Sequence, residues 1–266
     1  MPEQPVPTAT PSLLAGNQVV VLYGLPGHPD LGVLGAYSPD NAAAAAFSMA
    51  AQYDAANGSD GAKAMLDLVY AQAQAGPTDN GLYLRYLSNR EVRQYLRLAD
   101  RDDLQIMLDL QIGRGDPLDE VRKIERFLRD PRVHVAIDPE YAVGPDGVPL
   151  ETAGTISGEQ LNAIQDYVSG LVERYGLPPK LVVVHQYLDG TVTDGETIRG
   201  APNVDLVFNM DAFGALDEKA RKYSGFARRA YSQRHGFNVF MRHDDRVMSA
   251  DEISRLSPPP DVIFYQ

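Results

Sequence analysis

Short apolar segments recur along the chain and are separated by polar stretches with helical periodicity. Each apolar segment is rich in Val, Ile, Leu or Phe and is bounded by Pro, Gly or Asp. This pattern is typical of strands that are buried on both faces of a parallel sheet. It predicts eight strands, at residues 18–24, 65–73, 104–111, 133–138, 181–187, 204–211, 237–243 and 261–266.

Helix signals separate most of the predicted strands. Residues 40–56 are rich in Ala, and Asp116 followed by Pro117 has the form of an N-cap and a first-turn proline. Capping-box spacing, a Ser followed three residues later by Glu or Gln, occurs at 88–91, 157–160 and 249–252. Helices are therefore expected over 40–56, 88–98 and 216–233 and after residues 116, 157 and 249, whereas the connection 188–203 has weak helical character.

The alternation of strands and helices over 266 residues predicts a single (β/α)8 barrel of the TIM type, with an irregular or absent last helix. A doubly wound open sheet is the alternative fold. It is disfavoured because no Gly-rich dinucleotide or phosphate motif follows any predicted strand. Residues 1–17 are rich in Pro and Thr and have no periodicity, so we predict a disordered tether there and a barrel domain over 18–266.

Composition narrows the possible partners. The chain is 44% hydrophobic and 23% charged, as is usual for a soluble protein with a sizeable core. Its net charge of −12 repels phosphate, so no nucleic-acid partner is expected. No apolar run approaches the ~18–20 residues of a transmembrane segment. The absence of Cys excludes disulfides, a thiolate nucleophile and a Cys-ligated metal.

Polar side chains end almost every predicted strand. In a barrel these ends meet at one face, where the active site lies. Carboxylates that are buried there without partners cost several kcal/mol each, so they must pair with one another or face a wet pocket. The residues in question are Tyr23, His28, Gln72, Asp109, Gln111, Asp138, Glu140, Tyr141, His185, Gln186, Asn209, Asp211, Arg242 and Tyr265.

Such a pocket suits a carbohydrate, because carboxylates and amides bind hydroxyl groups and Tyr stacks on a sugar ring. Asp138 and Glu140 are two residues apart and share one side if the strand continues. A neighbouring carboxylate raises the pKa of the other, so Glu140 is expected to be the general acid. Asp138 and Asp109 are the further catalytic candidates, and the other residues of the set are assigned to substrate binding. We assign no metal and no cofactor.

Four of these residues also have structural interpretations. Glu140 could be a solvated loop residue. Asp138 could cap the turn that follows it, as Asp often does before Pro. Asp109 could form an ion pair with Arg114. His185 could be an interior histidine that is bonded to Asp211 or to a backbone carbonyl.

Two segments resemble the chitinase-like family-18 glycosidases. IDPEY (137–141) resembles the end of that family's acidic signature, and FNMDAFG (208–214) resembles its sixth-strand segment. The resemblance implies that Glu140 is the acid, that Asp138 orients the acetamido group of the substrate, and that Asp211 binds substrate. The chain departs from the family at the earlier signature acids and at the last strand, where Tyr265 replaces a pocket Trp.

A longer set of segments resembles a family of uncharacterised secreted bacterial proteins, many of them lipoproteins. The segments are YGLPGHPDLGVLG (23–35), LDLQIGR (108–114), AIDPEY (136–141), VVVHQY (182–187) and the final FYQ. This resemblance implies an exported, single-domain protein at the cell surface or outside the cell, with a lipid anchor upstream. It implies no particular activity.

The sequence therefore predicts an exported glycoside-hydrolase-like enzyme that acts on a carbohydrate or another polar small molecule. Two alternatives stay open. One is a metal-dependent hydrolase in which His185, Asp138 and Asp211 supply nitrogen and oxygen ligands. The other is a non-catalytic carbohydrate-binding barrel at the cell surface. A Ser nucleophile is disfavoured because no Ser follows a strand in a G-x-S-x-G setting.

Overall fold

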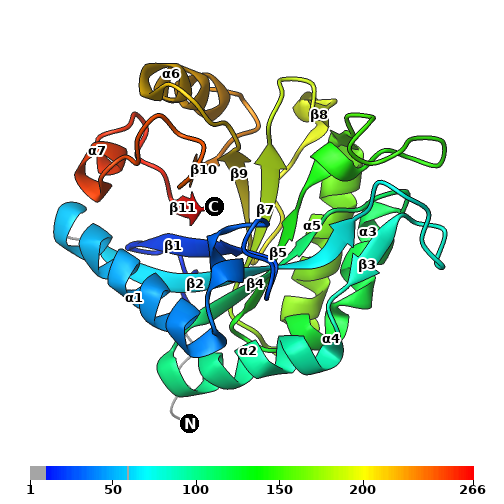
Figure 1. Ribbon diagram of the computed structural model, residues 1–266, viewed down its shortest axis with the longest axis horizontal. Helices are drawn as coiled ribbons and strands as arrows, with labels where there is room; N and C mark the ends of the chain where they lie inside the picture. The colour runs from blue at the N-terminus through cyan, green and yellow to red at the C-terminus, as the bar shows by residue number, and fades with distance from the viewer. Residues whose placement is uncertain (1–9, 59) are drawn as a thin grey trace, which may run out of the picture.

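Eight parallel strands close into a barrel in the computed structural model, which describes residues 10–58 and 60–266 (Figure 1). Around the ring they are β1 (Asn17–Gly24), β2 (Gly61–Ala73), β4 (Gln105–Leu110), β5 (Val133–Ile137), β7 (Lys180–Gln186), β9 (Val204–Met210), β10 (Arg234–Val239) and β11 (Val262–Tyr265). β1 pairs in parallel with both β2 and β11, which closes the sheet. The predicted barrel is confirmed, and the open-sheet alternative is excluded.

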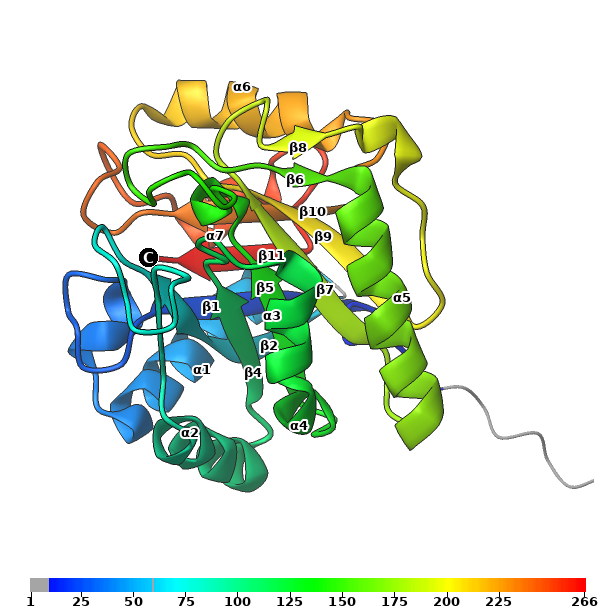
Figure 2. The same ribbon diagram turned by 90° about the vertical axis from the view of Figure 1, so that its right-hand side faces the viewer.

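Helices surround the barrel on its outside, as two perpendicular views show (Figures 1 and 2). They are α1 (Pro39–Ala56), α2 (Asn89–Asp102), α3 (Pro117–Lys123), α4 (Glu125–Leu128), α5 (Gly158–Tyr175), α6 (Leu216–Ala227) and α7 (Ala250–Ser254). The capping boxes at Ser88, Ser157 and Ser249 are all formed. Among the helices that the structure describes, none has the length and apolar character needed to cross a bilayer.

The connection between β7 and β9 has little helical structure, as its sequence predicted. It contains one short 3-10 turn, Gly195–Thr197, and the two-residue strand β8 (Val192–Thr193). β8 pairs in parallel with β6 (Ile156–Ser157), which lies just before α5.

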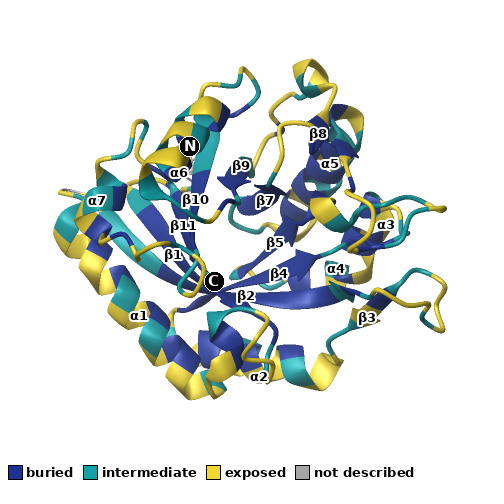
Figure 3. Cartoon of the chain, turned by 45° about the horizontal axis from the view of Figure 1, so that its top comes forward, coloured by how far each residue is buried: buried dark blue, intermediate teal, exposed yellow. Residues whose placement is uncertain are grey.

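The strands separate two cores, because their side chains point alternately into the barrel and toward the helices. The inner core contains Val19, Val21, Met65, Met107, Ala136, Leu181, Val183, Val207 and Val262, all of which are fully buried. The outer core fills the layer between strands and helices. In Figure 3 the strands are buried along most of their length, while the outward faces of the helices are exposed. This alternation determines which strand residues can reach a site inside the barrel.

Residues of the predicted tether contact the bottom of the barrel. Residues 1–9 lie outside the described part of the chain. The Ser12 hydroxyl donates a hydrogen bond to Asp205, at the N-terminal end of β9. Leu14 is only 5% exposed and packs with the inner core. The described residues that precede β1 therefore close the N-terminal end of the barrel.

β10 ends earlier than the sequence pattern predicted. The N–H of Phe240 donates to the carboxylate of Asp244 at 3.0 Å, so the chain turns after Val239 instead of continuing to residue 243. Lys219 of α6 holds the same carboxylate through a buried ion pair. Arg242 consequently lies in an exposed loop, 3.4 Å from Asp30, and not at the end of a strand.

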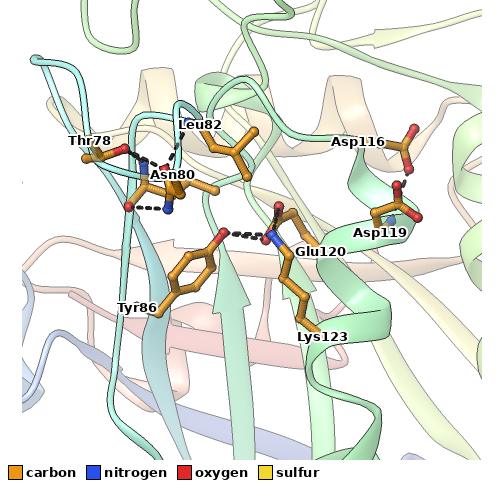
Figure 4. Close-up of polar contacts among 9 residues, drawn as sticks. Thr78, Asn80, Leu82, Tyr86, Asp116, Asp119, Glu120 and Lys123 are labelled. Carbon is orange, nitrogen blue, oxygen red and sulfur yellow. Dashed lines mark hydrogen bonds and ion pairs between the residues drawn. The ribbon is translucent and has the colours of Figure 1, made fainter.

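Three short strands were not predicted. Two are β6 and β8, and the third is β3 (Leu84–Tyr86), which pairs antiparallel with the end of β2. The Tyr86 hydroxyl donates to Glu120 of α3 at 3.0 Å, and Lys123 donates to Glu120 at 2.6 Å and to Tyr86 at 2.9 Å (Figure 4). Thr78 donates to Asn80 within the loop that joins β2 to β3. These bonds hold that loop beside the C-terminal mouth of the barrel.

Candidate active site

Acidic side chains surround one histidine inside the C-terminal end of the barrel. Asp67 of β2 follows the inward residue Met65 by two positions, and Asp109 of β4 and His185 of β7 occupy equivalent inward positions. Asp138 directly follows β5, and Asp211 directly follows β9. Asp67 and Asp109 are 0% exposed, His185 is 2% exposed and Asp138 is 7% exposed. We call these five residues the acid–histidine cluster.

The ring of His185 is held between two carboxylates. Its Nδ1 atom lies 3.0 Å from Oδ2 of Asp211, and its Nε2 atom lies 3.4 Å from Oδ2 of Asp109. The buried amides of Asn209 and Asn238 donate to Oδ1 of Asp211, so the orienting carboxylate is itself fixed. The rings of Tyr23 and Phe264 pack edge-on against the imidazole, with centroids 6.0 and 5.1 Å away.

Several polar atoms of the cluster lack hydrogen bonds. Within residues 10–58 and 60–266, neither carboxylate oxygen of Asp67 or of Asp109 has a hydrogen-bond partner, and Nε2 of His185 has only the 3.4 Å ion-pair contact with Asp109. One donor atom from each of these three residues lies within 4.8 Å of the others. Buried polar groups without partners are costly, so shared protons, ordered water or a bound cation must satisfy these atoms.

Burial dominates the electrostatics of the cluster. It raises the pKa of Asp67 and of Asp109, and the neighbouring carboxylates raise both pKa values further, while His185 acts against them. Burial also raises the pKa of Asp138 well above its usual range. Burial alone would lower the pKa of His185, but Asp211, Asp109 and Asp138 together raise it to about 10. Without a cation, His185 is therefore an imidazolium among carboxyl groups that share protons.

Glu140 lies at the rim of the mouth and not beside Asp138. β5 ends at Ile137, and Oδ1 of Asp138 accepts the N–H of Glu140 at 3.2 Å, which caps the 3-10 turn Pro139–Tyr141. The extended spacing therefore does not persist, and Asp138 points inward while Glu140 is exposed. Partial burial of its carboxyl group raises the pKa of Glu140, and the charge of Asp211 adds to this effect.

Two adjoining cavities open at the mouth. The larger has a volume of about 460 Å³ and is lined by Tyr23, Val69, Gln72, Gln111, Tyr141, Leu150, Gln266 and residues of the loops that follow β1 and β10. The smaller, of about 240 Å³, is lined by Glu140, Tyr141, Leu150, Tyr187, Leu188, Thr191 and residues 151–154. Asp67 and Asp109 line neither cavity. Tyr23 lines the larger cavity and packs on His185, so its ring separates this cavity from the acid–histidine cluster.

The loop after β1 folds back to form one wall of the larger cavity. The N–H of Leu25 donates to the carbonyl oxygen of Leu31 at 2.8 Å, which brings Gly32 against Gly24. A Cβ atom on Gly32 would lie 2.5 Å from Cα of Gly24, and φ at Gly32 is +92°, so only glycine fits there.

The structure brings most of the predicted site residues to this mouth. Six of them form or contact the acid–histidine cluster: Tyr23, Asp109, Asp138, His185, Asn209 and Asp211. Another four line the larger cavity: Gln72, Gln111, Tyr141 and Arg242. Arg114, the predicted partner of Asp109, instead donates to the carbonyl oxygen of Gly147 at 2.7 Å. His28 is exposed and lines neither cavity, although the next two residues of its loop line the larger one.

Gln186 and Tyr265 are placed away from the site. Gln186 follows the inward-facing His185 and therefore points outward, where it donates to the Tyr231 hydroxyl at 3.1 Å. Tyr265 follows the inward-facing Phe264, and its hydroxyl lies 2.9 Å from that of Tyr53 in α1. The alternation of side chains along a strand excludes both from the barrel interior.

Sequence reasoning missed Asp67 and Asn238. The sequence Met-Leu-Asp-Leu occurs at residues 65–68 and again at 107–110, and each copy places its Asp inside the barrel. The repeat was the available signal for Asp67. The strand-end pattern indicates Gln72 and not Asp67, because β2 continues for six residues beyond Asp67.

No family model matches the chain, and no curated protein matches it in sequence. A solved structure of a hyperthermophilic endo-beta-1,4-glucanase in complex with substrate aligns with 92% of this chain and 87% of its own, at 8% identity and a TM-score of 0.43. The barrel assignment rests on the strand pairing of this chain.

Proposed function

We propose that this protein is a glycoside-hydrolase-like enzyme that acts on a carbohydrate at the C-terminal mouth of its barrel. One observation carries the proposal: acidic side chains from β2, β4, β5 and β9 converge on this mouth, next to cavities lined by Tyr and Gln. Carboxylates and amides bind sugar hydroxyls, and Tyr23, Tyr141 and Tyr187 offer ring faces for stacking. Glycoside hydrolysis requires acid groups at the same place.

Glu140 is the proposed general acid. It borders the smaller cavity and is reached from solvent, and its raised pKa favours the protonated form that an acid needs. Asp138 is mostly buried and uses one oxygen to cap the turn, so only its other oxygen is available to a substrate. Asp211 is the second carboxylate near Glu140, since its charge contributes to the pKa shift of Glu140.

Asp109 has a different proposed role from Glu140. Its side chain is 0% exposed and lies beneath Tyr23, so it acts on the site through His185 and does not contact substrate. It is a positioning residue in this proposal.

Export is a separate part of the proposal. It rests on the resemblance of the segments YGLPGHPDLGVLG and VVVHQY to secreted bacterial proteins, which also suggests a lipid anchor upstream. Fractionation of the producing cell tests it, and recovery of the protein only from the cytosol would contradict it.

The activity is tested with cello-, chito- and cell-wall-type oligosaccharides by measuring the release of reducing ends. We expect turnover by the wild type and a loss of about 10²–10⁴-fold in Glu140→Gln, the usual contribution of general acid catalysis. Glu173→Gln is the matched control, because Glu173 is an exposed residue of α5 outside both cavities. Sugar binding without turnover by the wild type would instead indicate a non-catalytic binding barrel.

A further inference from the structure

We propose that Asp67, Asp109 and Nε2 of His185 bind one divalent cation, Zn²⁺ or Mn²⁺, inside the barrel beneath Tyr23. The three donor atoms already lie within 4.8 Å of one another. Ligand atoms bound at about 2.0–2.2 Å from one metal lie about 3.3–4.4 Å apart, so small side-chain movements complete the site. The three residues come from β2, β4 and β7, so the closed sheet fixes their positions.

The orientation of His185 supports this assignment. Its Nδ1 atom is engaged by Asp211 at 3.0 Å, which leaves Nε2 directed at Asp109. Histidines that bind metals use one ring nitrogen for the metal and commonly donate the other N–H to a carboxylate. Asp211 is in turn held by the amides of Asn209 and Asn238, as expected for a group that orients a metal ligand.

Among the described buried side chains with unsatisfied atoms, the ionisable ones are Asp67, Asp109 and His185, and this chain satisfies its buried ionic groups elsewhere. Lys180, which is 1% exposed, donates to the carbonyl oxygens of Asp130 and Val133. Glu120, also 1% exposed, accepts from Tyr86 and Lys123. By contrast, the four carboxylate oxygens of Asp67 and Asp109 and Nε2 of His185 have no hydrogen-bond partner within the described residues. A cation supplies the missing partner to all three side chains at once.

The donor set indicates the class of metal. Two carboxylates and one imidazole form a mixed oxygen and nitrogen set that suits Zn²⁺ and Mn²⁺. Ca²⁺ takes six to eight oxygen ligands, which this set does not provide. The ligands differ from the set His185, Asp138 and Asp211 that the sequence suggested, because Asp211 occupies the other nitrogen of the ring.

The cation site is independent of the proposed acid. Glu140 lies exposed at the rim, whereas the three ligands are at most 2% exposed and line neither cavity. A cation beneath Tyr23 would offset the charge of the cluster and hold its side chains in place. The chain could therefore bind the metal even if Glu140 catalyses nothing.

The test uses the full chain, stripped with a chelator and titrated with Zn²⁺ and, separately, with Mn²⁺ by calorimetry and thermal melting. We expect binding of one equivalent of at least one of the two metals, with a rise in Tm. Asp67→Asn removes a ligand and should weaken binding by more than ~100-fold, whereas Asp211→Asn removes an outer partner and should weaken it about 10–100-fold. Asp103→Asn is the control, because Asp103 is exposed and Asn tolerates its left-handed backbone.

Two results would overturn the site: no saturable binding of either metal by the stripped wild type, or unchanged affinity in Asp67→Asn. A second measurement does not depend on the folding of a variant. Wild type loaded with Co²⁺ should show visible ligand-field bands of a low-coordinate site, and a spectrum equal to that of aqueous Co²⁺ would contradict the proposal. Glu140→Gln should bind metal like the wild type. The metal site can therefore be confirmed or refuted even if the hydrolase proposal fails.

Discussion

Oδ2 of Asp211 lies 3.0 Å from Nδ1 of His185, and this contact joins the loop after β9 to the interior of the barrel. The same carboxylate accepts the amide of Asn238, a side chain of β10 that is 0% exposed. Three strands of the barrel are thereby connected through one acid. Its partners are side chains that the fold, and not local sequence, brings together.

Asn238→Ala should destabilise the protein by about 1–3 kcal/mol, because it removes a hydrogen bond to a largely buried carboxylate and leaves that acceptor short of a donor. Urea unfolding measures the change. Asn41→Ala is the control, since the Asn41 side chain is exposed and makes no hydrogen bond within the described residues, so its loss should be smaller. Equal losses in the two variants would show that Asn238 has no special role.

Lys222→Gln should shift the pH dependence of the proposed activity. The Lys222 cation lowers the pKa of Glu140, against the effects of burial and of Asp211, so its removal raises that pKa. Because a general acid acts in its protonated form, the alkaline limb of kcat/KM against pH should move to higher pH. Arg221→Gln, at an exposed neighbouring position, should leave the profile unchanged. A shift toward lower pH in Lys222→Gln would refute Glu140 as the acid.

Lys180→Met should remove part of the pH dependence of stability. Burial lowers the pKa of Lys180 to about 7, and Asp130 only partly offsets this effect. Between about pH 7 and pH 10 the unfolded chain therefore binds more protons at this position than the folded chain, so this residue makes stability rise with pH by up to about 1.4 kcal/mol per unit.

Urea unfolding of the wild type and of Lys180→Met at several pH values isolates this contribution, because the other titrating groups cancel in the difference. His134, the neighbouring histidine, has a pKa lowered well below its usual value and is neutral throughout this range. Parallel stability curves for the two proteins would contradict the prediction.

The barrel was predictable because its signal is local. Most strands contain a short apolar run, and several helix starts have a cap that sequence alone reveals, as at Ser88, Ser157 and Ser249. The sequence did not predict β3, because this strand has only three residues and is defined by its pairing with β2.

The site was predictable only to the level of strand ends. The sequence places Asp109, His185 and Asp211 near one mouth. Consecutive residues of a strand point to opposite sides, so an assignment that is one residue off gives the wrong side of the sheet. For this reason the sequence wrongly placed Gln186 and Tyr265 inside the barrel. The separation of Asp138 from Glu140 depends on where β5 stops, which Pro139 decides together with the cap at Asp138. The sequence does not reveal the proposed cation site, because its ligands Asp67, Asp109 and His185 come from three distant strands and form no compact motif.

Leu14→Ala should destabilise the protein by about 2–4 kcal/mol, the usual cost of emptying a buried Leu position. Leu14 is 5% exposed and packs into the inner core from the N-terminal end of the barrel. Thermal and urea unfolding measure the loss, and Leu13→Ala, at a less buried position, should cost less. A negligible effect of Leu14→Ala would mean that this segment is a tether, as the sequence suggested.

Tyr265→Phe should affect stability and leave activity unchanged. Its hydroxyl bonds to Tyr53 of α1 at 2.9 Å, on the outer side of the strand, and the substitution leaves the buried Tyr53 hydroxyl without this partner. We expect a loss of about 1–2 kcal/mol in urea unfolding. Because the side chain lines neither cavity, kcat/KM and sugar affinity should remain within experimental error of the wild type.

Tyr23→Ala provides the contrast, since it removes an aromatic ring from the larger cavity and should weaken sugar binding. If Tyr265→Phe instead reduced sugar binding, the outward orientation of this last strand residue would be incorrect, and with it the register that places Phe264 against His185.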